Sequence, residues 1–298
     1  MVTWRRRVAR ETGADAALSV QTLAVLLQAG ASPHVAWRHL AESGDPRATA
    51  IVKRTQAGTP LVTAIEAEGG AWIDLAAAWE IGSTVGAPLA EVLRAIAETL
   101  RDGASAADDV RIALAEPAGT ARLLLWMPLT GLLLGVALGF DTVGVMVGTP
   151  LGAACGVLGL LLVFVSRLWM RALLRRAQPK PGTPGMQAEL LAVALRGGAS
   201  VERALRLVSE SPASTRRGEE RVAAVLELSR AAGVPAVELL RASAAQDRHR
   251  ERIDGRLRAS ALSTRMLIPL GVCTLPAFML LGVAPLLLSV LSTTSLPL

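Results

Sequence analysis

Residues 123–166 read LLLWMPLTGLLLGVALGFDTVGVMVGTPLGAACGVLGLLLVFVS, and Asp141 is the one charged side chain among them. A helix that crosses the ~30 Å hydrocarbon core of a bilayer needs about 20 apolar residues, so this stretch is too long for a single crossing. We therefore predict a transmembrane hairpin over 121–166, with helices at 123–140 and 143–166 and a turn near Asp141.

A second uncharged stretch covers residues 266–298. Its length predicts a third transmembrane helix over 265–291 and a short extracytoplasmic tail over 292–298. Pro269, Pro276 and Pro285 should bend this helix or interrupt its hydrogen bonds, because proline has no backbone N–H and crowds the preceding turn.

The basic residues beside the three spans predict their orientation, because Lys and Arg near the ends of spans are retained on the cytoplasmic side. These residues are Arg111, Arg122, Arg167, Arg171, Arg175, Arg176, Lys180, Arg248, Arg250, Arg252, Arg256, Arg258 and Arg265. The hairpin turn and the C-terminal tail have no Lys or Arg. We expect a multi-pass protein of the cell membrane, with a cytoplasmic N-terminus and an extracytoplasmic C-terminus.

Glycine recurs at every fourth position in the predicted hairpin, which puts glycines on one face of each helix and lets backbones approach closely. The candidate packing residues are Gly131, Gly135, Gly139, Gly144, Gly148, Gly152 and Gly156. Two interpretations stay open: the hairpin packs on itself, or the glycine face contacts a second copy or another membrane protein.

The charged regions on either side of the hairpin contain an internal repeat. LAVLLQAGASPHVAWRHLAES at 23–43 and LAVALRGGASVERALRLVSES at 191–211 are identical at 11 of 21 positions. GAPLAEVLRA at 86–95 matches GVPAVELLRA at 233–242, and the offset between the copies falls from 168 to 147, so the second copy is 21 residues shorter. Gly30 and Gly198 suit the left-handed position after a helix, and Ser32 and Ser200 suit the N-cap of the next one.

The fold class that follows is an all-α membrane protein with two cytoplasmic antiparallel helical bundles and three transmembrane helices. The expected order outside the spans is a basic N-terminal segment at 1–14, the first copy at 15–120, a basic Pro/Gly linker at 167–185 and the shortened second copy at 186–264. Mean hydropathy is +0.44 and net charge is +6. The positive charge lies beside the spans and the chain has no Tyr for base stacking, so we expect membrane lipids and no nucleic acid as its partner.

Motifs that carry catalysis do not occur in the sequence. It has no phosphate-binding loop, no GxGxxG, no HExxH and no CxxC. His34 and His39 are five apart, which does not put two ligands on one helical face. We expect no enzyme activity, no catalytic residue, no cofactor and no metal site.

The repeated blocks resemble those of the type II secretion system F family, the platform proteins of secretion systems and type IV pili. The motifs are LLQAGAS at 26–32 and GAPLAEVLRAIA at 86–97, and RMLIPL at 265–270 with Leu275 and Pro276 beyond it is similar to the Tad pilus subgroup. The resemblance extends from about residue 18 to 290.

The resemblance implies a non-enzymatic platform that couples a cytoplasmic hexameric secretion ATPase to pilin extraction and filament assembly. Partners would be the ATPase, pilin or pseudopilin subunits, and further copies or a paralogue in an oligomer. We expect Glu91, Arg94, Glu238 and Arg241, at exposed positions of the repeated blocks, to contact a partner. The competing class is a permease or channel-like subunit of an ATP-driven transporter.

Overall fold

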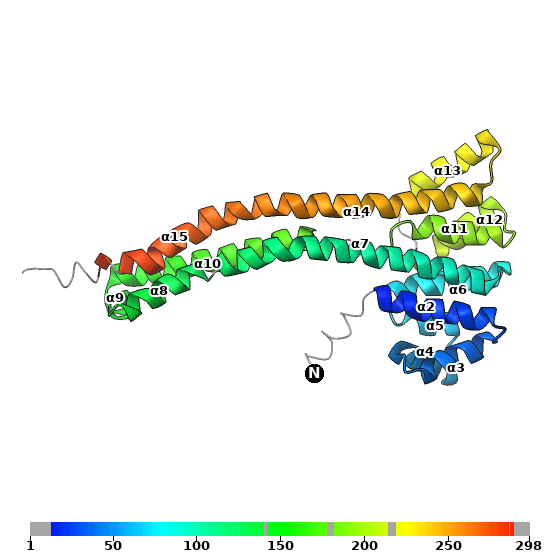
Figure 1. The fold of residues 1–298 in the computed structure, drawn as a ribbon, viewed down its shortest axis with the longest axis horizontal. Helices are drawn as coiled ribbons and strands as arrows, with labels where there is room; N and C mark the ends of the chain where they lie inside the picture. The colour runs from blue at the N-terminus through cyan, green and yellow to red at the C-terminus, as the bar shows by residue number, and fades with distance from the viewer. Residues whose placement is uncertain are drawn as a thin grey trace, which may run out of the picture. The chain divides into compact units, whose positions relative to one another are not determined.

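The structure is a computed structural model that describes residues 13–124, 126–139, 142–177, 182–213, 219–285 and 287–288. All regular secondary structure in these ranges is helical, as predicted (Figure 1). The chain divides into two compact units, Met1–Asp108 with Lys180–Ile253 and Asp109–Pro179 with Asp254–Leu298. We call them unit 1 and unit 2.

Unit 1 contains the helices of both repeated blocks. The first block forms α2 (Gly13–Gln28), α3 (Pro33–Glu42), α4 (Pro46–Gln56), α5 (Leu61–Glu66), α6 (Ala71–Val85) and the beginning of α7 (Leu89–Leu124). The second block forms α11 (Met186–Arg196), α12 (Val201–Glu210), α13 (Glu219–Ala232) and the beginning of α14 (Ala236–Pro269). Among the described residues, α4 and α5 have no counterpart in the second block, which agrees with its shorter length.

The helix boundaries of the two blocks follow from the same residue types. Gly30 and Gly198 have φ of 91° and 86°, and each follows a helix end, as predicted. Ser200 accepts a hydrogen bond from the backbone N–H of Arg203 at 3.3 Å, which is the expected N-cap. Ser32 has the extended backbone of an N-cap, but its side chain caps nothing.

One hydrophobic core holds unit 1 together. Its fully buried side chains come from both blocks and include Leu23, Ile51, Leu75, Leu93, Leu190, Leu191 and Leu240. Helices α6 and α11 lie so close that a Cβ on Gly197 would meet Val85 Cγ2 at 2.2 Å. The expectation of two separate bundles is therefore corrected: the apolar faces of the two blocks pack against each other instead of closing two cores.

Among its described residues, unit 2 contains the remainder of α7 and α14 and six further helical segments. These are α8 (Met127–Ala137), α9 (Thr142–Gly148), α10 (Pro150–Ala177), α15 (Leu275–Phe278) and two π-helical segments, η2 (Leu270–Thr274) and η3 (Met279–Val283). Helix α8 packs against η3 and α15, and α10 packs against η2, α15 and η3.

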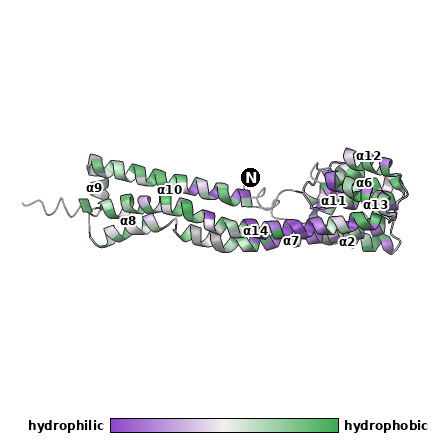
Figure 2. Cartoon of the chain, turned by 90° about the horizontal axis from the view of Figure 1, so that it is seen from above, coloured by the Kyte–Doolittle hydropathy of each residue, from purple (hydrophilic) through white to green (hydrophobic). Residues whose placement is uncertain are grey.

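Two helices in the described ranges are long and apolar enough to cross a membrane. They are Pro150–Ala177 and the continuous helical stretch Ala236–Val283, and Met127–Ala137 is a shorter apolar helix. Only 22% of the most apolar window of α10 is buried, which is unlike the core helix of a soluble protein. Figure 2 shows α8 and α10 largely in the colour of hydrophobic residues. Such an uncovered apolar surface suits lipid and is costly in water.

Two changes in the helices of unit 2 occur at prolines. The segment 143–166, predicted as one helix, is divided at Thr149, and Pro150 begins α10. After Pro269 the backbone changes from α-helix to π-helix, as expected for a residue that removes a hydrogen bond from the helix. Phe140 and Asp141 of the predicted turn lie outside the described residues.

Candidate functional site

The best-defined polar site of unit 1 joins α7, α11 and α14. No three His, Cys, Asp or Glu side chains group for a metal ion in the ranges that the structure describes. Ion pairs instead connect the three helices in a closed ring. We call this group, Glu91–Arg196, Glu189–Arg241 and Asp102–Arg248, the ion-pair ring.

The ring uses two of the four predicted contact residues. Glu91 on α7 lies 3.4 Å from Arg196 Nη1 on α11, and both side chains are about half exposed. Arg241 on α14 lies 3.7 Å from Glu189 Oε1, and only 29% of its side chain is exposed. Arg241 therefore helps to hold two helices together and presents less surface than the sequence predicted.

The other two predicted contact residues lie at the surface. Arg94 is exposed and donates a hydrogen bond to Gln28 Oε1 of α2. Glu238 is exposed in the first turn of α14, where its negative charge interacts favourably with the positive end of the helix dipole. Glu91, Arg94 and Glu238 are thus all exposed, whereas Arg241 is partly buried.

Burial has the largest effect on the pKa of Glu189 in the ring. Glu189 is 5% exposed, and burial raises the pKa of its carboxyl, while the charges of Arg241 and Arg248 oppose that rise and Glu98 adds to it. The Arg248 side chain is 11% exposed, and its Nε lies 3.2 Å from Asp102 Oδ2 without the alignment of a hydrogen bond. Glu189 and Arg248 are therefore the buried charges of the ring, whereas Glu91 and Arg196 remain about half exposed.

A second buried carboxylate connects the chain after α10 to the first block. Asp74 of α6 is 7% exposed and accepts a hydrogen bond from the hydroxyl of Thr183 at 2.6 Å. Burial raises the pKa of Asp74 to about 6, and the hydrogen bond from Thr183 limits the rise.

The sequence contained a signal for Asp74 but none for Glu189. Asp74 interrupts the apolar run AWIDLAAAW at 71–79, and a lone acid on an apolar helix marks a buried carboxyl. Glu189 occupies the position of Gln21 in the first block, and its burial arises only from the packing of α11 between α7 and α14.

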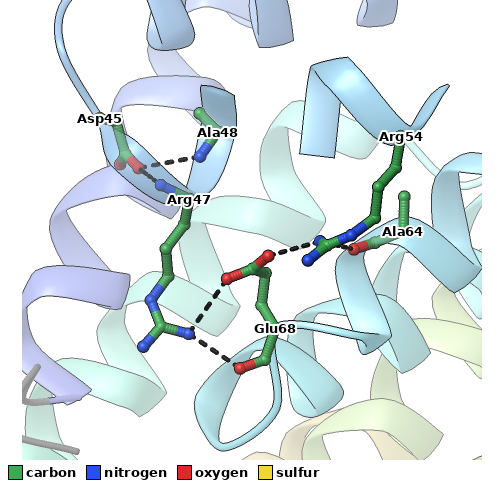
Figure 3. Close-up of polar contacts among 6 residues, drawn as sticks. All are labelled: Asp45, Arg47, Ala48, Arg54, Ala64 and Glu68. Atoms are coloured by element: carbon green, nitrogen blue, oxygen red, sulfur yellow. Dashed lines mark hydrogen bonds and ion pairs between the residues drawn. The ribbon is translucent and has the colours of Figure 1, made fainter. Parts of the chain in front are cut away.

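A third set of polar contacts fixes the first block around Glu68, between α5 and α6 (Figure 3). Glu68 Oε1 lies 2.5 Å from Arg54 Nη1, and Oε2 lies 3.5 Å from Arg47 Nη1. Arg47 also donates to the backbone carbonyl of Glu68 at 2.9 Å. Asp45 caps α4 by accepting from the backbone N–H groups of Arg47 and Ala48, both at 2.9 Å. These contacts hold α4 and α5 together, and the side chains of Arg47 and Arg54 both point toward Glu68.

The predicted glycine positions of unit 2 fall into different environments. A Cβ on Gly131 would meet Phe278 Cε2 at 2.7 Å, and one on Gly156 would meet Met146 Cγ at 3.0 Å. Gly135 and Gly152 are buried, whereas Gly144 and Gly148 are exposed and Gly139 ends α8 with φ of 85°. Gly159, which the pattern did not include, would meet Leu281 Cγ at 2.6 Å. Close packing within the chain thus occurs at Gly131, Gly156 and Gly159.

Comparison with known proteins adds one finding. The chain matches no curated protein. Residues 19–137, which contain the first block and the first apolar helix, match the family model of the type II secretion system (T2SS) protein F. The match covers less than half of the 298 residues. It supports, for that segment, the resemblance to the type II secretion system F family that the repeated blocks predicted.

Proposed function

We propose that the chain is an inner-membrane platform protein of a type II secretion or Tad-like type IV pilus machine. In this role it couples a cytoplasmic secretion ATPase to the extraction of pilin subunits and their assembly into a filament. The observation that carries the proposal is the T2SS protein F match at residues 19–137. The uncovered apolar surface of α8 and α10 supports a location in the membrane.

The proposed topology has three crossings, with unit 1 in the cytoplasm and the C-terminus outside. Basic residues beside the ends of the apolar stretches support this orientation. Single cysteines at Thr49 and at Asp141 in a variant free of Cys155 and Cys273 test it. A membrane-impermeant maleimide should label the cysteine at 141 in intact cells and the cysteine at 49 only after lysis. The reverse pattern would exclude the proposed orientation.

The ATPase contact is proposed on the exposed surface around Glu91, Arg94 and Glu238. Glu91 and Arg94 lie one turn apart on α7, and their present partners, Arg196 and Gln28, hold them at the surface with exchangeable contacts. Exposed pairs of this kind contribute ~1 kcal/mol or less, so a partner can replace them at little cost. Arg241 is excluded from this surface because it holds Glu189.

Co-purification of the full-length protein with the secretion ATPase tests this contact. Reversing both charges, with Glu91→Arg and Arg94→Glu, should weaken capture of the ATPase. Glu80→Arg with Lys53→Glu, two exposed positions outside the repeated 86–97 motif, is the matched control and should retain it. Undiminished capture by the first variant would remove these residues from the interface. Solute uptake into proteoliposomes that depends on the ATPase would favour the transporter class over the platform.

A further inference from the structure

An open apolar groove lies on the second block, between α11, α12 and α13. Its volume is about 490 Å³. Leu191, Val208 and Val222 are buried at its base, and Leu205 stands 40% exposed beside it. The groove is part of unit 1, away from the ion-pair ring that joins α11 to α7 and α14.

The corresponding surface of the first block is covered by the chain itself. The repeat aligns Leu191 with Leu23, Leu205 with Trp37, Val208 with Leu40, Val222 with Leu75 and Leu226 with Trp79. All five first-block residues are buried. Helix α4 packs on α3 and α5 packs on α6, with Ile51 and Ile65 fully buried among them. The aligned positions of the second block are also apolar, but among its described residues no helices corresponding to α4 and α5 cover them.

The polar residue at the end of the groove supports the same comparison. Ser19 in the first block donates a hydrogen bond to Oδ2 of Asp45, the N-cap of α4. The aligned residue of the second block is Gln187, which lines the groove, and its buried Oε1 has no hydrogen-bond partner. The free backbone N–H groups in the first turn of a docked helix are donors that such an acceptor can bind.

The charged side chains beside the groove indicate which charge its occupant should carry. Arg206 of α12 and Arg230 of α13 line it, and Glu227 pairs with Arg230 at 3.7 Å. Arg206 is exposed and has no cross-helix ion pair among the contacts described, so it can bind a carboxylate brought by a partner.

We propose that this groove binds an amphipathic helix of another protein, with small and β-branched residues on its apolar face and a carboxylate that reaches Arg206. The helix would take the place that α4 and α5 take in the first block. A second copy of this chain is a poor occupant, because its own α4 and α5 would have to leave a core in which Ile51 and Ile65 are fully buried.

A synthetic peptide of residues 45–68, the α4–α5 segment, serves as the probe. Fluorescence anisotropy of the labelled peptide is measured with the full-length protein in detergent micelles. A second peptide with Thr49→Glu, Lys53→Glu and Gln56→Glu adds carboxylates at exposed positions. We expect saturable binding of both peptides, tighter for the acidic one, and Arg206→Glu should reverse that order.

Leu205→Glu should weaken binding about 10-fold or more, because it places a charge on the apolar wall. Leu228→Glu is the matched control, since Leu228 lies on α13, is 54% exposed and does not line the groove. Gln187→Leu should also weaken binding, because it removes the acceptor for the helix N-terminus. Absence of binding, or binding insensitive to Leu205→Glu, would overturn the proposal. Dimers that Leu205→Glu dissociates would assign the groove to self-association instead and would equally overturn it.

Discussion

The hydroxyl of Thr183 donates a 2.6 Å hydrogen bond to Oδ2 of Asp74, whose carboxyl is buried among the apolar side chains of unit 1. Thr183 follows α10 and Asp74 belongs to α6, so the bond joins residues 109 positions apart in sequence. Burial raises the pKa of Asp74 from 3.8 to about 6. The bond therefore lies at a position that titrates near neutral pH.

Replacing Asp74 should change how stability depends on pH. The folded protein keeps the Asp74 proton at pH values where the unfolded chain has released it, so ionisation costs stability as pH rises from about 4 to about 6 and costs the full amount above pH 6. Asp74→Asn should thus increase the free energy of unfolding at pH 8 by up to about 3 kcal/mol and leave it nearly unchanged at pH 4. The melting temperature should rise at pH 8 accordingly. Thr183→Val, which keeps the methyl group, should destabilise more at pH 8 than at pH 4. A gain that is equal at both pH values would show that Asp74 does not titrate as described.

Gly185 should tolerate no side chain. It begins α11 with φ of 79°, and a Cβ would lie 2.6 Å from the backbone oxygen of Ala244. Since backbone cannot move aside as a side-chain tip can, Gly185→Ala should cost about 3 kcal/mol or more. Gly182→Ala is the control, because Gly182 also has positive φ but has nothing within 4 Å of a Cβ, and should cost about 1 kcal/mol. Thermal unfolding in detergent measures both, and equal losses would contradict the predicted contact with Ala244.

Glu68→Gln should loosen α4 and α5. The Glu68 side chain is 12% exposed and pairs with Arg47 and Arg54, so the substitution leaves two arginines without their carboxylate. We expect a loss of about 1–3 kcal/mol and faster proteolysis between residues 45 and 68. Glu66→Gln, two positions away and exposed, should change stability by about 0.5 kcal/mol or less. If both variants resist protease like the unaltered protein, the contacts of Glu68 are not what holds these helices.

Gly131→Ala should weaken the packing of α8 on the helical stretch after α14. Its Cβ would approach the ring of Phe278 to 2.7 Å, so the helices or the ring must shift. The double variant Gly131→Ala with Phe278→Leu should recover part of the lost melting temperature, because the smaller side chain makes room. Gly148→Ala, with nothing within 4 Å, should be neutral. A double variant no more stable than Gly131→Ala would argue against a direct contact.

Local features of this fold were predictable from the sequence because they depend on neighbouring residues. Gly30 and Gly198 end helices, and Ser200 caps one, since the backbone conformations they adopt depend on the residue itself. The sequence also located the apolar helices, because length and absence of charge are sufficient to identify them.

The arrangement of the blocks was not predictable in the same way. An amphipathic pattern says which face of a helix is buried, but not which helix covers it. The sequence therefore suggested two cores, whereas Leu191 and Leu93 share one. The break at Thr149 was hidden because Gly144, Gly148, Gly152 and Gly156 keep one spacing through Pro150. Among the predicted contact residues, the partial burial of Arg241 was not predictable, because its partner Glu189 is buried only through tertiary packing.

The single core of unit 1 also sets an order of events during synthesis. Its two contributions, residues 13–108 and 182–253, are separated in the chain by 109–179, which contain the apolar helices α8, α9 and α10. A ribosome delivers the first contribution, then the apolar segments, and only afterwards Leu190, Leu191 and Leu240, which complete the core. The nascent first block must therefore keep an apolar face exposed while the apolar segments that follow it are synthesised. Chaperone dependence of this protein should be greatest in that interval.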